Sequence, residues 1–330
     1  MEVVRIADCE DSRVTGFLAS QQFLPIQQTP VWARFQKSLG VESFRLAVLE
    51  KQKVLAFAQI FVKRLPFGLS KIELSRGPLF HKTWSIKHET EISDLLLAEI
   101  KKIAEERKVI FARFDFQKDS SFTAKKLKKA REENYPLATV RIDLQKSLDE
   151  ILAEMKPKGR YNIRVAEKHG VKISVENSVD DFFALLQKTT ARDGFSGHPK
   201  SFYAKMLEVL GDDCALLIAR KNGQPLAAIL VTFAGDTATY YFGASDHEFR
   251  PLMAPYLLQF EAIKIAQKRG CHFYDFLGIA PENSSRHRLA GVSDFKKKFG
   301  GEIVTYPQPK ITVFRPFFYR LFRLAKFLRP

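Results

Sequence analysis

The sequence predicts an α/β protein made of two similar domains, each a mixed β-sheet covered by helices. The first observation is a repeated order of hairpin, helix and buried strand along the 330 residues. The second is the length, because single hydrophobic cores stop growing at about 250–300 residues. Chance agreement between two sets of common elements is the alternative explanation of the repeat.

Each predicted half begins with a hairpin of two apolar runs. In the first half, residues 45–50 and 55–63 flank a polar turn. In the second half, residues 215–220 and 226–233 flank a turn that contains Asn222-Gly223. Asn-Gly is a strong hairpin signal because both residues tolerate a positive φ.

Each hairpin is followed, at some distance, by a helix and a strand. Apolar residues recur at intervals of three and four in segments 95–108 and 256–270, which is the spacing of one buried helix face. The strands that follow, 109–116 and 271–279, both contain Asp-Phe near their ends. The two halves therefore share one order of elements.

The predicted domain boundary follows residue 146, inside a helix-like segment that comes after the strand 139–144. We expect domain 1 at residues 1–146 and domain 2 at residues 147–308. The closing segment 309–330 is expected to pack back on domain 1.

The composition is strongly basic. Fifty-three Lys and Arg residues oppose 37 Asp and Glu residues, which gives a formal net charge of +16 and a pI near 9.7. This charge favours a polyanionic partner, such as nucleic acid, a nucleotide diphosphate or an anionic membrane face. It also fits a protein that is basic only to stay soluble.

Cysteine usage and the N-terminus favour the cytoplasm. Cys9, Cys214 and Cys271 form neither a CxxC motif nor a pairing framework. The N-terminus lacks the basic start and apolar core of a signal peptide, and no apolar run approaches bilayer length. We expect a protein that is neither exported by a signal peptide nor membrane-spanning.

No metal or cofactor site is predicted. The seven histidines show no HxxxH or Cys-His spacing, and no nucleophile-elbow pattern supports Ser-His-Asp catalysis. Residues 267–272 begin like the pyrophosphate loop of an acyl-CoA enzyme, but they end in His272 within a helix-to-strand turn, so the fit is poor.

Two basic segments are candidates for binding or catalysis. In segment 155–168, a proline-broken entry leads into a helix with Arg160, Arg164 and Lys168 on one face, which can hold phosphates or be a solvated surface. In segment 292–301, three lysines lie between Phe295 and Phe299 and precede a glycine pair. This arrangement fits a catalytic cation clamped by the two rings, and it equally fits a short solvated turn.

Isolated charged residues form a second group of candidates. Lys37 lies beyond the expected core residues Trp32 and Phe35 of a helix capped by Thr29. Arg192 ends a helix before Gly194, where it can bind an anion with two hydrogen bonds or pair with its neighbour Asp193. Asp115 and Asp275 end corresponding strands, where each can orient an amine or act as a structural hydrogen-bond acceptor.

The C-terminal segment 315–330 is amphipathic if it is helical. Its apolar side would carry Phe317, Leu321, Leu324 and Leu328, and its basic side Arg320, Arg323 and Lys326. Such a helix can lie on an anionic membrane, or it can dock onto the first domain.

Six runs in this order resemble the Fem family of non-ribosomal peptidyl transferases, which build peptidoglycan cross-bridges. The runs are TPVWARFQK (29–37), SRGP (75–78), FARFDF (111–116), MKPKGRYNIRVAEKHGV (155–171), YDFLGI (274–279) and FKKKFGG (295–301). The likeness covers nearly the whole chain. The fourth and sixth runs together are the specific ones.

The resemblance implies two tandem GNAT-like domains, named after the acyl-CoA N-acyltransferase fold, and a tRNA ester as the acyl donor. Some family members carry an inserted helical hairpin in the second domain. Here segment 168–171 runs directly into the strand 172–175, so we expect no inserted coiled-coil arm.

The resemblance also implies roles for residues. Lys37 and Arg192 match the cations that grip the phosphates of the precursor, and Lys296, preceded by Phe295, matches the pair at the acyl-transfer centre. Tyr241 matches a substrate-binding tyrosine, with its neighbour Tyr240 as the alternative. Arg160, Arg164 and Asp115 complete the set of predicted substrate-binding residues.

The predicted function is transfer of an amino acid from aminoacyl-tRNA to the stem-peptide amine of a nucleotide-linked or lipid-linked peptidoglycan precursor. It implies a cytoplasmic enzyme, with a peripheral position at the inner membrane face as a second expectation. An acyl-CoA-dependent N-acyltransferase is one alternative. A non-catalytic protein that binds tRNA or membrane is the other.

Overall fold

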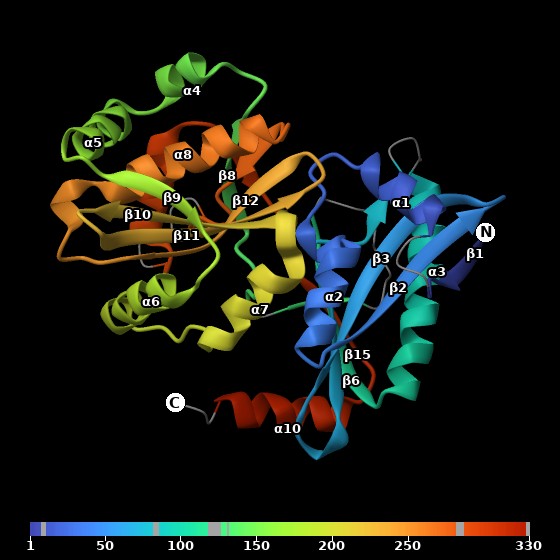
Figure 1. Ribbon diagram of the computed structural model, residues 1–330. Coiled ribbons are helices and arrows are strands. Elements are labelled where there is room, and N and C mark those ends of the chain that lie inside the picture. The colour runs from blue at the N-terminus through green and yellow to red at the C-terminus, as the bar shows by residue number, and fades with distance from the viewer. Residues whose placement is uncertain (8–10, 82–85, 118–126, 131, 282–286, 328–330) are drawn as a thin grey trace. The chain divides into compact units, whose positions relative to one another are not determined.

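The computed structural model describes residues 1–7, 11–81, 86–117, 127–130, 132–281 and 287–327 (Figure 1). The chain divides into two compact units. Unit 1 comprises Met1–Gln21, Gln27–Tyr135 and Tyr306–Pro330, and unit 2 comprises Gln22–Ile26 and Pro136–Thr305.

Unit 1 contains a mixed sheet in the order β1-β2-β3-β4-β6-β15-β7, with β5 paired to β3. All neighbouring strands are antiparallel except β4 and β6, which are parallel. The strands are β1 (Glu2–Arg5), β2 (Glu42–Glu50), β3 (Lys53–Arg64), β4 (Ser70–Ser75), β5 (Leu79–Phe80), β6 (Val109–Asp115), β7 (Lys128–Lys129) and β15 (Lys310–Val313).

Helices cover the sheet of unit 1 because each buries one apolar face. In α3 (Ile86–Glu106), Ile92, Leu96, Ile100 and Ile103 are fully buried against the strands, at the spacing predicted from the sequence. The other helices are α1 (Ser12–Ala19), α2 (Pro30–Ser38) and α10 (Pro316–Phe327), with short 3₁₀ turns at Ile26–Gln28 and Pro66–Gly68.

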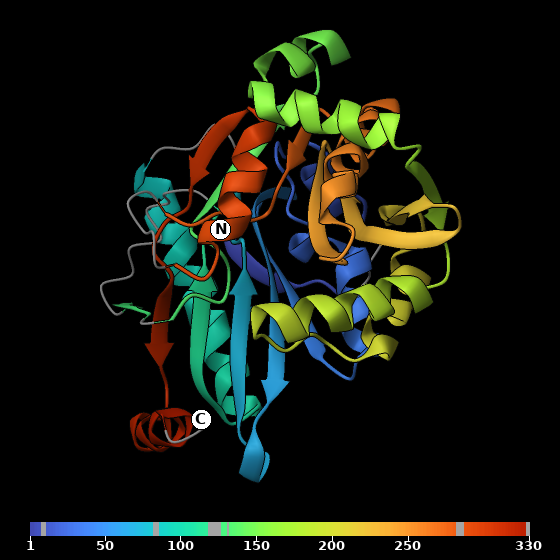
Figure 2. The same ribbon diagram turned by 90° about the vertical axis from the view of Figure 1, so that its left-hand side faces the viewer.

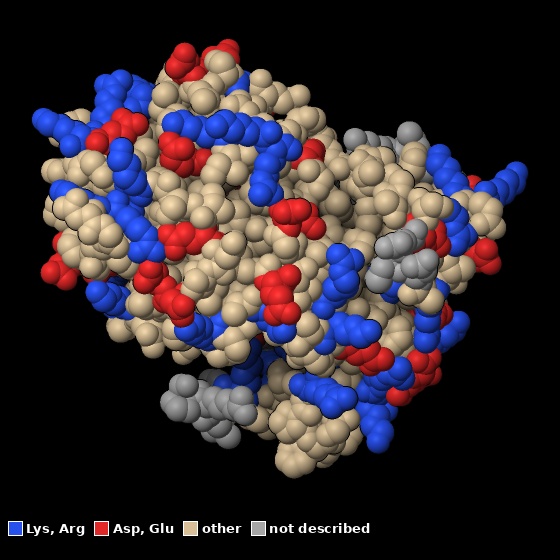
Figure 3. All heavy atoms as spheres, in the orientation of Figure 1, with Lys and Arg blue, Asp and Glu red and all other residues tan. Residues whose placement is uncertain are grey.

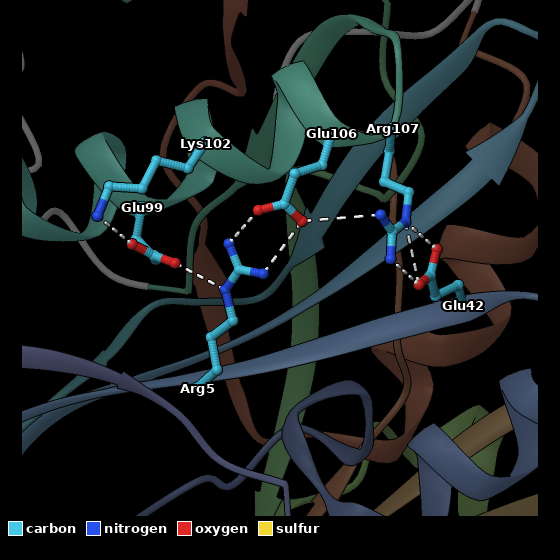
Figure 4. A network of polar contacts seen from close by, with 6 residues as sticks. All are labelled: Arg5, Glu42, Glu99, Lys102, Glu106 and Arg107. Carbon is cyan, nitrogen blue, oxygen red and sulfur yellow. Dashed lines mark hydrogen bonds and ion pairs between the residues drawn. The ribbon is translucent and has the colours of Figure 1, made fainter.

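Ion pairs tie the N-terminal strand of unit 1 to α3 (Figure 4). Arg5 on β1 pairs with Glu99 at 2.7 Å and with Glu106 at 2.8 Å, and Arg107 pairs with Glu42 of β2 at 2.9 Å. These side chains are partly exposed, so water screens the pairs and each contributes little to stability. They connect α3 and the residue after it to the neighbouring strands β1 and β2.

Unit 2 contains a second mixed sheet in the order β14-β8-β13-β12-β11-β10-β9. Only β12 and β13 are parallel neighbours. The strands are β8 (Ala138–Asp143), β9 (Lys172–Glu176), β10 (Cys214–Lys221), β11 (Gln224–Ala234), β12 (Thr237–Ser245), β13 (Phe273–Asp275) and β14 (Glu302–Thr305).

The helices of unit 2 lie on both faces of this sheet, with α8 and α5 on one side and α6 on the other (Figure 1). They are α4 (Leu148–Glu154), α5 (Pro157–Lys168), α6 (Asp180–Asp193), α7 (Lys200–Leu210), α8 (Ala254–Lys268) and α9 (Ala290–Lys296). Short 3₁₀ turns occur at Gly211–Asp213, Arg250–Leu252 and Lys297–Phe299.

The predicted duplication is confirmed. In unit 1 the hairpin β2-β3 leads through β4 and α3 to β6, and β6 pairs in parallel with β4. In unit 2 the hairpin β10-β11 leads through β12 and α8 to β13, and β13 pairs in parallel with β12. The turn of the second hairpin has positive φ values of 50° at Asn222 and 80° at Gly223, as its sequence predicted.

The division between the units differs from the predicted boundary after residue 146. The structure divides the chain between Tyr135 and Pro136 because β8 pairs with β13 and β14 of unit 2. Residues 22–26 also belong to unit 2, where the Phe23 ring lies 4.3 Å from Phe273. Contacts between segments distant in the sequence assign both β8 and residues 22–26 to unit 2. Local sequence patterns do not predict such contacts.

Two further expectations concern insertions and membrane spans. Only residues 169–171 join α5 to β9, so no helical arm is inserted there. Within the described parts of the chain, no helix has both the length and the apolar character needed to cross a bilayer.

Gly159 and Gly300 bring the two most specific sequence runs into backbone contact, and Gly301 packs the second run against β8. A Cβ atom at Gly159, the start of α5, would lie 2.6 Å from the carbonyl oxygen of Lys298. A Cβ at Gly300 would lie 2.7 Å from the carbonyl oxygen of Glu154, and one at Gly301 would lie 2.3 Å from that of Arg141. The runs 155–171 and 295–301 therefore form one packed element of unit 2.

We expect Gly301→Ala to lower the free energy of unfolding by about 3 kcal/mol, because the new Cβ meets backbone and the position has a φ of +78°. Guanidinium denaturation measures the change. Gly291→Ala is the matched control: this exposed position in α9 has nothing within 4 Å of its Cβ, so alanine should be neutral or stabilising there. Equal stability of the two variants would contradict the proposed contact.

Candidate functional site

A buried lysine is the central feature of unit 2. Lys296 is the last residue of α9, and only 7% of it is exposed. Its Nζ donates hydrogen bonds to the carbonyl oxygens of Phe276 and Gly278, both at 2.7 Å. The ring centroid of Tyr240 lies 5.2 Å from Nζ. An ammonium group has three N–H bonds. Among the described residues two of them have acceptors, which leaves one N–H for a further acceptor.

A strained turn after β13 presents these carbonyl groups to Lys296. Leu277 has a φ of +65°, which is unusual for a bulky residue. Gly278 N donates to Phe276 O at 2.8 Å, which closes a three-residue turn around Leu277. Asp275 stabilises this turn, since its Oδ1 accepts hydrogen bonds from Leu277 N and from Thr139 Oγ1, both at 2.6 Å. Such strain is typical of functional sites.

Burial changes the acid–base properties of the site. Desolvation lowers the pKa of Lys296 from 10.5 to about 8, although the nearby Asp275 opposes the change. Burial also raises the pKa of Tyr240 to about 12, so its phenol stays neutral. The lysine can therefore donate or accept a proton near neutral pH, which an ordinary surface lysine does not do.

A β-bulge separates the two adjacent tyrosines of β12. Leu230 of β11 lies opposite Phe242, and the next residue, Val231, lies opposite Tyr240, so Tyr241 is the extra residue of the bulge. The Tyr240 ring contacts Lys296, whereas the Tyr241 ring lies 5.1 Å from Phe242. The sequence-based assignment preferred Tyr241, but Tyr240 is the neighbour of the buried lysine.

The predicted clamp of Lys296 between Phe295 and Phe299 does not form. The Phe295 ring packs on Tyr256 at 4.9 Å and on Phe299 at 5.3 Å, within the hydrophobic core of unit 2. Successive residues of a helix point about 100° apart, so Phe295 and Lys296 face different surroundings. Phe295 supports α9 from the core side.

The three basic residues predicted on one face of α5 have different surroundings. Arg160 Nη1 donates to the carbonyl oxygens of Leu152 and Ala153, at 3.3 and 3.1 Å, and to that of Met155. It therefore satisfies carbonyl groups at the end of α4. Arg164 and Lys168 are exposed and remain able to meet an anion.

Arg192 lies in the last turn of α6, before Gly194 in the left-handed conformation. Its guanidinium donates to both carboxylate oxygens of Asp193, at 2.6 and 2.7 Å. This is the pairing that the sequence left open as the alternative to anion binding.

In unit 1, Lys37 is exposed at the end of α2, and Asp115 is buried. Both oxygens of Asp115 accept hydrogen bonds from Arg113, at 2.9 and 2.8 Å. The geometry gives Asp115 a structural ion pair, which fits the alternative interpretation from the sequence.

Arg76 lies in the SRGP run, but the sequence assigned it no role. Arg76 is 6% exposed, its guanidinium lies 3.5 Å from the ring centroid of Tyr306, and Nη1 donates to Phe116 O at 3.3 Å. Phe116 follows Asp115 as Phe276 follows Asp275, so each unit directs a buried cation at the equivalent carbonyl group. The repeated Asp-Phe ending was the available signal.

Two other kinds of site find little support. Within the described ranges, no group of three His, Cys, Asp or Glu side chains could hold a metal ion. Cys214 and Cys271 are buried, and burial raises their pKa values to about 12 and about 11, so neither thiol is an activated nucleophile. Cys9 lies outside the described residues.

Comparisons with known proteins agree with this architecture. The FemAB family model matches residues 121–224 and 219–327. The lipid II:glycine glycyltransferase of Staphylococcus epidermidis is 23% identical, over 91% of this chain and 89% of the relative. The enzyme of the same name from Staphylococcus aureus is 24% identical, over 95% of this chain and 92% of the relative.

Solved structures share the fold. The crystal structure of FemX superposes with a TM-score of 0.83 at 20% identity, covering 97% of this chain and 99% of that one. A tandem GNAT protein from the clavulanic acid pathway gives a TM-score of 0.59 at 12% identity, covering 94% and 98%. The predicted pair of GNAT-like domains is therefore confirmed.

The lowered pKa of Lys296 predicts a pH-dependent stability. Below about pH 8 the lysine is protonated in both states, and folding buries the charge; from there to about pH 10.5 only the unfolded chain holds the proton. The free energy of unfolding should therefore rise with pH in this window, by at most roughly 3 kcal/mol.

Denaturation at several pH values checks this prediction, with Lys296→Met as the reference. The methionine variant removes the titrating group but keeps a long apolar side chain, so the rise should be present only in the wild type. Parallel curves for the two proteins would show that Lys296 titrates normally.

Proposed function

Because the FemAB model matches more than half of it, the chain belongs to the FemAB family, and we propose that it transfers an amino acid from aminoacyl-tRNA to the stem-peptide amine of a peptidoglycan precursor. The named relatives that support this activity are glycyltransferases similar over nearly their full length. The observation that carries the proposal is the buried Lys296, whose Nζ keeps one N–H for a reacting oxygen.

The reaction needs few chemical groups because the aminoacyl ester is already activated. The precursor amine attacks the ester carbonyl and forms a C–N bond, and the C–O bond to the ribose breaks. The amine nitrogen loses one proton, and the departing ribose oxygen takes up one proton. Neither a covalent nucleophile nor a metal is demanded. The protein must align the amine and stabilise the negative charge on oxygen.

Lys296 is suited to that second task. In our proposal its protonated Nζ donates to the oxyanion or to the departing ribose oxygen. Burial strengthens this hydrogen bond because little water screens it, and a pKa of about 8 makes proton transfer to the leaving oxygen easier than from an ordinary lysine. The neutral Tyr240 ring beside Nζ keeps the site apolar without neutralising the charge.

We propose that Lys37 and Arg192 bind the phosphates of the precursor. Lys37 is exposed. Arg192 already binds a carboxylate with two parallel hydrogen bonds, the geometry that a phosphate also accepts. Since a partly exposed ion pair contributes little net free energy, a phosphate can replace Asp193.

The proposed donor, aminoacyl-tRNA, fits the basic surface of α5. Arg164 and Lys168 are exposed there, and Lys156 and Lys158 are exposed at the start of the helix. The visible face in Figure 3 carries many Lys and Arg side chains among fewer Asp and Glu side chains. Phosphate contacts of this kind add affinity without reading sequence.

An acyl-CoA donor fits the chain less well. Residues 267–272 lie at the C-terminal end of α8, where the helix dipole repels phosphates. The backbone N–H groups of Gly270, Cys271 and His272 already donate to carbonyl oxygens of Gln267, Ala266 and Asp236. They are therefore not available to cradle a pyrophosphate.

We place the enzyme in the cytoplasm, with peripheral contact at the inner membrane face when its acceptor is lipid-linked. The segment 315–330 is the proposed contact, and its residues 328–330 lie outside the described ranges.

We expect Lys296→Ala to lower kcat by about 10²–10³-fold and to leave binding of the precursor nearly unchanged. The assay supplies a mixed pool of charged tRNA with purified precursor and measures the mass added to the product. Absence of any added mass with the wild type would refute aminoacyl transfer itself.

Lys297→Ala is the control, because this neighbouring lysine is not placed in the site. Wild-type kcat should also decline above about pH 8, where Lys296 loses its proton. A kcat that rises through this range would assign Lys296 the role of a base.

We expect Lys37→Ala and Arg192→Ala each to raise the KM for the precursor by about tenfold while kcat changes little, because each removes a charged hydrogen bond to a phosphate. Steady-state kinetics with a nucleotide-linked precursor measures both constants. Arg34→Ala, an exposed cation of the same helix as Lys37, should leave KM unchanged. An unchanged KM in either test variant would remove that residue from the phosphate site.

A further inference from the structure

One end of unit 1 exposes apolar side chains to water. Phe67, in the turn between β3 and β4, is 98% exposed. On α10, Phe317, Leu321 and Leu324 are 67%, 48% and 60% exposed. Isolated exposed apolar residues are common, but a group of this size marks an interaction surface.

The apolar stripe of α10 faces away from the protein. The helix packs against β6 through Tyr319 and Phe322, whose rings lie 5.2 and 5.5 Å from that of Phe111. At about 100° per residue, Phe317, Leu321 and Leu324 fall on the opposite side. A helix that only covered the sheet would be polar on its outer side.

The turn and the helix belong to the same surface. Leu65 and Leu69, which flank Phe67, pack against the small apolar cluster that also holds Tyr319 and Phe322. Figures 1 and 2, which are turned by 90° from each other, both show the β3–β4 turn and α10 at the lower end of unit 1. The two elements that carry the exposed apolar residues therefore lie at the same end of unit 1.

The C-terminal segment at this end carries charge of one sign. Residues 303–330 contain six Lys and Arg and no Asp or Glu. Lys326 pairs with Glu132, whereas Arg320 and Arg323 make no ion pair with any described residue. In Figure 3, the surface of α10 is tan and bordered by blue side chains.

We propose that this end of unit 1 docks on a bilayer that contains anionic phospholipid. The docking surface consists of Phe67, Phe317, Leu321 and Leu324, with Arg320 and Arg323 beside them. The apolar side chains enter the boundary between headgroups and acyl chains, and the arginines bind lipid phosphates. This inference refines the membrane contact of segment 315–330 proposed above, by adding Phe67 and the class of lipid, and it does not depend on the transfer reaction.

Charge favours a bilayer over a second copy of the chain. A symmetric contact through α10 would bring the arginines of two copies together without acidic partners in residues 303–330. An anionic bilayer instead supplies both the apolar layer and the negative charge that this surface lacks.

The test is co-sedimentation of the full chain with vesicles of phosphatidylcholine alone and of phosphatidylcholine mixed with phosphatidylglycerol. The wild type should bind the anionic vesicles, and added salt should weaken binding. Phe67→Ser, the double change Leu321→Ser and Leu324→Ser, and the double change Arg320→Gln and Arg323→Gln should each reduce the partition coefficient by about tenfold.

Val175→Ser is the matched control, because Val175 is 59% exposed on the edge strand β9 of unit 2. It should bind vesicles as the wild type does. Failure of the wild type to bind, or equal losses in the control and test variants, would overturn the proposal. So would a dimer in solution that the serine changes dissociate.

An assay of aminoacyl transfer to a nucleotide-linked precursor distinguishes failure of the docking proposal from failure of the proposed function. The docking variants should keep that activity, since no bilayer is involved. Vesicle binding without transfer activity would leave the docking surface intact and refute only the transferase.

Discussion

The hydrogen bonds from Lys296 to the carbonyl groups of Phe276 and Gly278 are the constraint on which the site depends. A buried ammonium without acceptors would be unstable, so the turn at Leu277 must keep its unfavourable φ. Asp275 holds this turn by accepting from Leu277 N and Thr139 Oγ1, and it thereby connects β13 to β8. The position of the Lys296 ammonium group therefore depends on contacts among α9, β13 and β8.

The duplication shows how similar frameworks acquire different chemistry. In unit 1 the aspartate at the end of the parallel strand, Asp115, pairs with Arg113, and Arg76 donates to the carbonyl oxygen of the next residue. In unit 2 the equivalent aspartate holds a strained turn, and a lysine occupies the equivalent place beside the carbonyl group. An arginine stays protonated at any physiological pH, whereas a buried lysine titrates near neutrality. Because unit 2 has Lys296 where unit 1 has Arg76, unit 2 is the better suited of the two to transfer a proton.

The sequence predicted the fold well because periodicity and turn residues are local. Asn222-Gly223 and the apolar spacing of α3 lie where the patterns placed them. Features set by distant pairing were missed: β8 joins unit 2, and a bulge in β12 brings Tyr240 rather than Tyr241 to Lys296. The hydrogen bonds from Arg160 to carbonyl groups at the end of α4 were also not predicted, because residue spacing gives the face of a helix but not the partner of a side chain.

The glycine contacts between residues 155–171 and 295–301 limit how this protein can change. At Gly159, Gly300 and Gly301, backbone lies against backbone with no room for a side chain. A chimera that takes one of these runs from a relative and keeps the other from this chain would combine surfaces that never adapted to each other. The backbone packing thus couples the basic helix to the segment of the buried lysine, and a shift of the backbone in one run has to be matched by a shift in the other.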